Sequence, residues 1–343
     1  MVSKKIIVPC AGVILFLILF FCPNDFMKGA ATGLKNSATI IVPSLFPSMV
    51  ASSLVAQSEL PPFFKKILEP VTQRLWGQPA ECVAAVFSGL FGGYPSGARA
   101  AAVLRENGVI SEGQAKRLML FCVNAGTGFC INALGVSLIG SLRAGVIVFA
   151  SLVVSALITG AFTKAESEPV TAVRRVEKTA SSAFVESVAS GASGIITVCA
   201  FSVLFSGLIA VISKIELSRN LLVAAACLLE ITSGCASAAG KTPLPLVCAA
   251  CAFGGVCVHL QIFAAAGKLK PKLTEFYLFR LLHAVLSAVV CKALLWIFPV
   301  AVQSGVQFSQ NVQAYSFSLP AALSLLFFSS LLILELDKQR KIC

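Results

Sequence analysis

The stretch FSGLFGGYPSGARA, from Phe87 to Ala100, decides how this chain folds, because four glycines and a proline interrupt an otherwise helical run. Glycine ends helices readily and proline removes a backbone donor, so together they predict a break in the helix. In hydrocarbon, a break is tolerated only where the backbone is buried in protein or lines a polar cavity. A second glycine-containing break is predicted from Ala249 to Ala266, at Gly254-Gly255.

The composition of the chain places these breaks inside a membrane. Of the 343 residues, 57% are hydrophobic and only 12% are charged, and the mean hydropathy is +0.90. Apolar stretches of about 20 residues, enough to cross about 30 Å of hydrocarbon, recur along the chain. We therefore expect an all-α polytopic membrane protein with about eight transmembrane helices plus two re-entrant or broken helical hairpins.

Basic residues account for a net charge of +12 and lie in short segments that flank apolar runs, such as Lys4 and Lys5. This distribution follows the positive-inside rule, so we expect contact with the lipid bilayer and no nucleic-acid partner. We expect an uncleaved N-terminal transmembrane anchor at residues 1–24, a cytoplasmic linker at residues 163–180 and a cytoplasmic tail at residues 337–343.

Thirteen cysteines do not predict a metal site, because most of them lie inside apolar runs where cysteine acts as a small hydrophobic residue. The single CxxC, Cys248 to Cys251, has no second pair and no histidine at ligand spacing. The chain has two histidines, His259 and His283, and no HExxH motif. We expect no metal, no cofactor and no catalytic residues, and therefore no enzyme.

The two halves of the chain match each other at a nearly constant offset. Phe91-Gly92-Gly93 matches Phe253-Gly254-Gly255, and an F-x6-G-x5-T-x4-S pattern begins at Phe26 and again at Phe184. Further matches pair Glu69 with Glu230, Gly33 with Gly191 and Arg117 with Arg280. Such repeats are common in transporters, and we expect repeats at 26–162 and 181–336. Loop charge and repeat symmetry disagree on whether the repeats are inverted.

Polar groups at membrane depth indicate the solute site, since they are costly there. The third predicted break is CVNAGTGF, Cys122 to Phe129. We expect helix amides and Arg99 to supply positive potential, and polar side chains to orient the solute. For Gly254-Gly255, close helix packing is the alternative. The candidate substrate-binding residues are Gly92, Gly93, Tyr94, Pro95, Ser96, Gly97, Arg99, Asn124, Gly126, Thr127, Glu230, Gly254, Gly255, His259 and Gln261.

These segments also carry a resemblance. VPSLFPSM, FGGYPSGARAA, KRLMLFCVNAGTGF, LLEITSG and FGGVCVHLQ resemble the sporulation integral membrane protein family of the YlbJ type, with two nucleoside-recognition (Gate) domains, over about residues 26–300. The resemblance implies a transporter of endospore-forming bacteria that moves a dipicolinate-type anion toward the forespore. It implies the bacterial cell membrane or the outer forespore membrane as its location. Thr127 stands where proline is common in that family.

The sequence analysis therefore favours a transporter for a small anionic or nucleoside-like solute. A nucleoside-type carrier of the Gate superfamily is one alternative. A non-transporting scaffold for spore assembly and an intramembrane enzyme are others. The sequence leaves open whether the chain forms a homo-oligomer.

Overall fold

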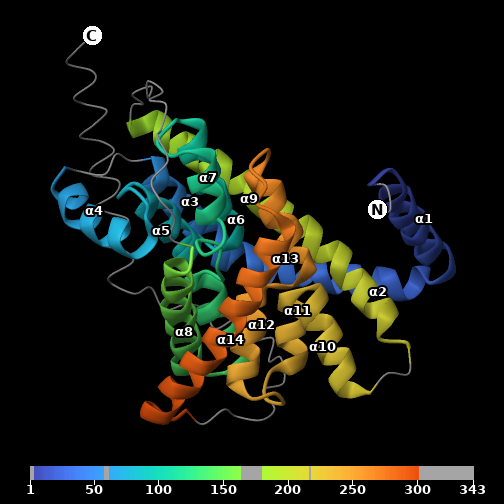
Figure 1. Ribbon diagram of the computed structural model, residues 1–343. Coiled ribbons are helices and arrows are strands. Elements are labelled where there is room, and N and C mark those ends of the chain that lie inside the picture. Colours follow the sequence, from blue (N-terminus) through green and yellow to red (C-terminus); the bar gives the residue numbers. More distant parts are fainter. Residues whose placement is uncertain (1–3, 58–61, 164–179, 216–217, 301–343) are drawn as a thin grey trace.

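A computed structural model describes residues 4–57, 62–163, 180–215 and 218–300, and all regular secondary structure in these ranges is helical (Figure 1). Most of the predicted linker, the end of the second repeat and the tail lie outside the described residues. The helices are α1 (Lys4–Phe21), α2 (Pro23–Asn36), α3 (Val42–Gln57), α4 (Pro62–Trp76), α5 (Cys82–Gly92), α6 (Tyr94–Glu106), α7 (Glu112–Leu118), α8 (Leu142–Ala161), α9 (Ala180–Ile212), α10 (Arg219–Leu229), α11 (Ile231–Ala238), α12 (Leu244–Phe253), α13 (Gly255–Ala266) and α14 (Leu273–Ile297), with π-helical segments η1 (Ser37–Ile41) and η2 (Gly128–Ile139).

Within the described residues, 5 helical stretches are long and apolar enough to cross a membrane. These stretches are Pro23–Val55, Leu142–Ala161, Ser181–Ile212, Leu244–Ala266 and Leu273–Ile297. Shorter apolar helices, among them α5, α10 and part of α1, accompany them. The chain is a polytopic, all-helical membrane protein, as predicted, while the count of eight spans stays a prediction.

The two halves meet along an antiparallel pair formed by the α2–η1–α3 stretch and α9. A Cβ on Gly33 would lie 2.8 Å from the Ser206 Cβ, and one on Gly191 would lie 2.9 Å from a Val50 methyl group. The start of one stretch therefore packs against the end of the other. Gly33 and Gly191 are matched positions of the predicted repeat, and the helices that carry them run in opposite directions, as they would in an inverted repeat. The repeat itself stays a prediction.

The first predicted break forms a re-entrant hairpin. Gly93, at φ +93°, separates α5 from α6, and a Cβ on Gly97 would lie only 2.8 Å from the Gly89 Cα. The two helices therefore fold back on each other. At 1.5 Å per residue, α5 and α6 are about 16 and 20 Å long, too short to cross about 30 Å of hydrocarbon.

The second break differs from the first, because α12 and α13 lie end to end across Gly254 (Figure 1). The stretch Leu244–Ala266 is long enough to cross the membrane. A further fold-back, at Glu230, was not predicted: a Cβ on Gly234 of α11 would lie 2.5 Å from the Cys227 Cα of α10. The second half therefore pairs a discontinuous helix with a separate hairpin.

The close packing of α2 on α9 is open to a direct test. A Cβ on Gly29 would lie 2.5 Å from both the Ala210 Cβ and the Ser206 carbonyl oxygen, whereas one on Gly12 meets nothing within 4 Å. We predict that Gly29→Ala lowers the free energy of unfolding by about 1–3 kcal/mol because it overpacks this contact. Gly12→Ala, the matched control, should change it little. Denaturant unfolding in detergent micelles measures both, and equal unfolding curves would contradict the packing.

Candidate solute cavity at the helix breaks

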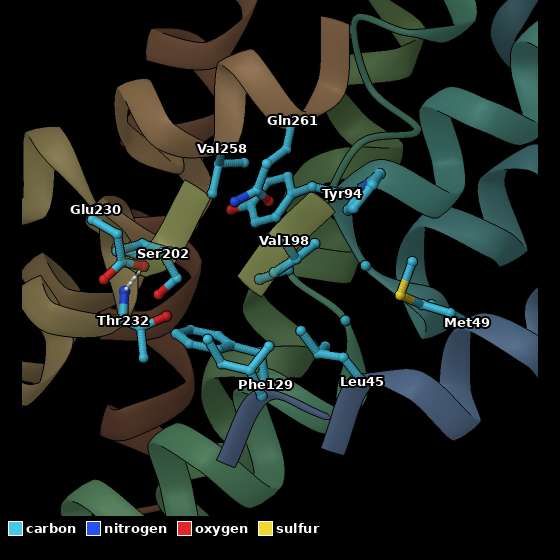
Figure 2. A pocket seen from close by; sticks show the side chains of 17 residues that line it. Leu45, Met49, Tyr94, Phe129, Val198, Ser202, Glu230, Thr232, Val258 and Gln261 are labelled. Carbon is cyan, nitrogen blue, oxygen red and sulfur yellow. Dashed lines mark hydrogen bonds between the residues drawn. The ribbon is translucent and has the colours of Figure 1, made fainter. Parts of the chain in front are cut away.

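A cavity lies where the helix breaks come together (Figure 2). Its walls come from both halves of the chain and are largely apolar, with Leu45, Phe129, Val198 and Val258 among them. Ser202, Glu230, Thr232 and Gln261 add polar groups. Of the candidate residues, the structure places these seven in the lining: Gly92, Gly93, Tyr94, Pro95, Gly126, Glu230 and Gln261.

The cavity is small in this conformation. The volume open to the centre of a water molecule is about 40 Å³. One water needs about 10–15 Å³ on this measure, so the space fits a few waters and no organic solute. An organic molecule could enter this space only if the surrounding helices moved.

Two of the breaks touch each other beside the cavity. A Cβ on Gly126 would lie 2.8 Å from both the Gly93 nitrogen and the Phe91 carbonyl oxygen, so only glycine allows this approach. The N-terminus of α6 begins at Tyr94, and η2 begins at Gly128. Helix N-termini carry a partial positive charge. The starts of α6 and η2 therefore meet at this side of the cavity, beside the C-terminal end of α5 at Gly92.

Glu230 occupies a third helix N-terminus at the cavity. Its side chain is buried, and its carboxylate oxygens accept hydrogen bonds from the backbone N–H groups of Thr232 at 2.9 Å and Ser233 at 2.7 Å. It therefore caps α11, where a negative charge is favourable. The capping explains how the chain holds an acidic side chain in its interior.

Several candidate residues support the breaks instead of facing the cavity. At the first break, the Thr127 hydroxyl donates to the Phe91 carbonyl at 3.2 Å, and the Ser96 hydroxyl donates to the Gly92 carbonyl at 3.1 Å. These are carbonyls that the end of α5 leaves without a helical partner. Both hydroxyls therefore stabilise the hairpin tip.

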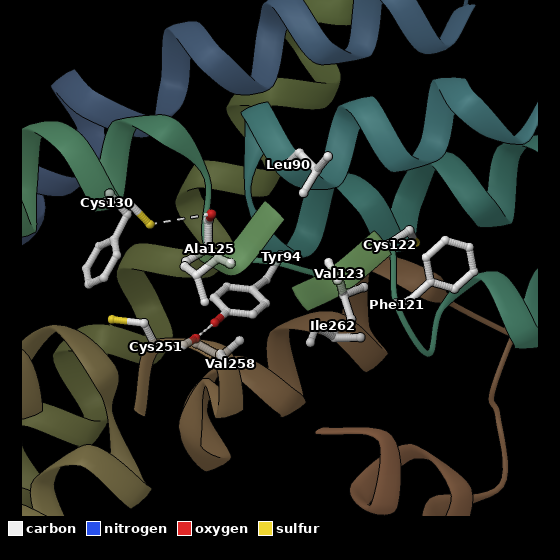
Figure 3. Close-up of a cluster of buried hydrophobic side chains, with 14 of the residues drawn as sticks. Leu90, Tyr94, Phe121, Cys122, Val123, Ala125, Cys130, Cys251, Val258 and Ile262 are labelled. Carbon is white, nitrogen blue, oxygen red and sulfur yellow. Dashed lines mark hydrogen bonds between the residues drawn. The ribbon is translucent and has the colours of Figure 1, made fainter. Parts of the chain in front are cut away.

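The end of α12 shows the same principle more completely. Gly254 N–H donates to the Ala250 carbonyl at 2.9 Å, and the Tyr94 hydroxyl donates to Cys251 (Figure 3). Arg280 lies 3.5 Å from the Ala252 carbonyl, and His259 Nε2 lies 2.8 Å from that of Phe253. Each of the last four carbonyls of α12 has a partner, and most of these partners are side chains.

Arg280 is the main residue that the sequence analysis did not assign to the site. It is 0% exposed, and its guanidinium donates to the carbonyls of Val123 at 2.7 Å and Leu120 at 2.8 Å, in the predicted CVNAGTGF region and the turn before it. Two features of the sequence could have indicated its role: it is a charged residue inside the apolar run of α14, and it matches Arg117 in the predicted repeat. Arg280 ties the third break to the end of α12.

The remaining candidates lie apart from the cavity lining. Arg99 is exposed and pairs with Glu106 at 3.4 Å, so it supplies no potential to this cavity. Asn124 is buried and donates to the Leu152 carbonyl of α8 at 3.3 Å. Gly97 forms the α5–α6 contact, and a Cβ on Gly255 would lie 2.8 Å from the Cys227 carbonyl oxygen. Among the described residues, no cluster of three or more His, Cys, Asp or Glu could hold a metal ion.

Comparison with known proteins gives one point of reference. The chain is 26% identical over 125 residues to the sporulation integral membrane protein YlbJ of Bacillus subtilis (strain 168). The match covers 36% of this chain and spans 31% of that protein's length. No family model matches the chain, and no solved structure matches it. The chain is thus similar to a membrane protein of sporulation, while the two Gate domains stay a prediction.

The role of Arg280 can be tested through stability. We predict that Arg280→Met lowers the free energy of unfolding by at least about 2 kcal/mol, because a buried carbonyl without a donor costs about 1–3 kcal/mol. Arg280→Lys should recover only part of this, since one ammonium cannot reproduce the forked guanidinium geometry. Arg99→Met, on the surface, should change it by less than about 0.5 kcal/mol. Thermal unfolding in detergent measures these stabilities. Equal destabilisation by Arg99→Met and Arg280→Met would contradict this role.

Proposed function

We propose that this chain is a membrane carrier that moves a small organic anion by alternating access to the cavity at the helix breaks. The observation that carries this proposal is the convergence of the α6 and η2 N-termini, at the contact of Gly93 with Gly126, on a cavity lined by both halves. Backbone amides at half-helix ends suit carboxylates. The apolar walls suit a flat organic body between them.

Movement is built into this arrangement. The cavity of about 40 Å³ must enlarge before any organic solute enters. The α5–α6 hairpin is too short to cross the membrane, so it can move relative to the spanning helices without being pulled through the bilayer. Its tip at Gly93 forms one wall of the cavity, and its displacement is the step that we propose opens the site.

The family resemblance of the sequence motifs suggests a finer proposal, and the similarity to a sporulation protein supports its sporulation part. We propose that the solute is an anion of the dipicolinate type, a pyridine ring with two carboxylates, and that the carrier acts in sporulation in the cell membrane or the outer forespore membrane. Phe129 and Leu45 offer apolar surface to a ring, and the partial positive charges at the N-termini of α6 and η2 would attract carboxylates.

A nucleoside-type carrier is the second candidate. The Glu230 carboxylate and the Gln261 amide both belong to the cavity lining, and both groups pair well with the donors of a base or a sugar. The two candidates make opposite predictions for Glu230. Its negative charge repels an anionic solute, whereas it would hydrogen-bond to a neutral one.

The test is uptake into proteoliposomes that contain the purified chain. We predict saturable uptake of radiolabelled dipicolinate, and we predict that Glu230→Gln lowers its KM by about threefold to tenfold because a nearby like charge is removed. Glu106→Gln, on the surface, should leave the KM unchanged.

Two results would redirect the assignment. Uridine uptake that Glu230→Gln weakens would favour the nucleoside carrier. Absence of any flux from correctly inserted, folded protein would favour a non-transporting scaffold and contradict the proposed function.

A further inference from the structure

A second cavity, with a volume of about 270 Å³, lies along α10, between the C-terminal ends of α9 and α11. Its walls are mostly apolar, with Ile209, Leu222 and Leu229 among them. Two basic side chains, Arg219 and Lys241, complete the lining. The sequence analysis did not identify this cavity. An apolar chamber with cations at one end suits a solute that has an apolar body and a negative charge.

The two cavities follow one another along the same helices. On α9, Ser202 lines the first cavity and Ile209 and Ile212 line the second. On α11, Thr232 lines the first and Ser237 lines the second. Each residue advances a helix by about 1.5 Å, so the second cavity begins about 10 Å beyond the first on α9 and about 7–8 Å beyond it on α11. It leads from the central site toward the helix ends at the loops after α9 and α11.

A thin layer of polar and apolar side chains separates the first cavity from the second. The hydroxyls of Ser206 on α9 and Ser233 on α11 are hydrogen-bonded at 3.3 Å, at the level between the two sets of lining residues. Leu229 lines the second cavity, and the next residue, Glu230, lines the first. One layer of side chains, with Ser206, Leu229 and Ser233, therefore divides the two spaces.

The charges at the mouth of the second cavity have no ion-pair partner among the described residues, whereas the neighbouring Lys214 pairs with Asp25 at 3.3 Å. Arg219 is the first residue of α10, and the first turn of that helix holds no acidic residue. A cation at a helix N-terminus is unfavourable for the helix, so this placement costs stability. An anion bound beside Arg219 would offset that cost.

We propose that the second cavity is the vestibule through which an anionic solute reaches the central cavity. Arg219 and Lys241 attract the anion, and the layer with the Ser206–Ser233 hydrogen bond is the closed gate. This inference rests on the proposed function for its route, but the vestibule and its charge preference can be measured without any transport assay.

The first experiment labels Ser237→Cys in nanodiscs of neutral lipid with two thiosulfonate reagents, one anionic and one cationic. Their rates are divided by their rates with a free thiol in solution, and labelling of the unsubstituted chain is subtracted. We expect the anionic reagent to be favoured by about threefold, because Arg219 and Lys241 line the same cavity as Ser237 and attract a negative charge. Arg219→Gln with Lys241→Gln should abolish this preference. The matched control, Lys268→Gln with Lys270→Gln, should keep it.

Three results of this experiment would overturn the vestibule. The first is a Ser237→Cys thiol that neither reagent reaches. The second is a preference that survives in the Arg219 and Lys241 double variant. The third is protection of Ser237→Cys by anionic phosphatidylglycerol in the nanodisc but not by dipicolinate, which would make the cavity a lipid site. Protection by millimolar dipicolinate supports the proposal.

The second experiment measures uptake by the double variant. We expect the KM for dipicolinate to rise by about threefold with kcat unchanged, and this difference to disappear at 1 M salt because charges at the mouth are then screened. An unchanged KM with normal transport would overturn the vestibule alone. If the unsubstituted chain shows no transport, the proposed function is overturned. The labelling result would still decide the charge preference of the cavity.

Discussion

The fold depends on one constraint: every main-chain carbonyl freed by a helix break within hydrocarbon must find a donor. At the end of α12, donors come from Tyr94, His259 and Arg280, on three different helices. At the tip of α5, they come from Ser96 and Thr127. The breaks are therefore stabilised by side chains that tertiary packing brings from other helices. The cavity is the space that remains between the breaks.

The same constraint limits how the site can move. An unsatisfied backbone group inside the bilayer costs several kcal/mol, so an opening motion must exchange donors instead of merely losing them. Tyr94 belongs to the α5–α6 hairpin, yet its hydroxyl partner is Cys251 of α12. Displacement of the hairpin consequently disturbs the end of α12 as well. This contact couples the two breaks, and through them the two halves of the chain.

Main-chain groups also account for Glu230 and Arg280, the two residues among Asp, Glu, Lys and Arg that are buried in the described core. Glu230 accepts two N–H groups at the start of α11, and Arg280 donates to carbonyls of Leu120 and Val123. Each charge is stabilised by main-chain groups at a helix break and not by an opposite side chain. A solute charge placed at the neighbouring N-termini of α6 and η2 would be stabilised in the same way.

The sequence by itself determined the membrane class, the helical fold and the positions of the breaks at Gly93 and Gly254, because composition and glycine–proline chemistry act locally. Seven of its candidate residues line the cavity, among them Gly93, Gly126 and Glu230, while their contact with a solute stays a prediction. Only the tertiary structure decided that the first break is a hairpin and the second an end-to-end joint, since the Gly89–Gly97 contact joins two helices. It likewise separated Arg99, on the surface, from Arg280, in the core. Local pattern cannot distinguish two arginines whose partners lie on other helices, because burial and hydrogen bonding arise only when the chain has folded.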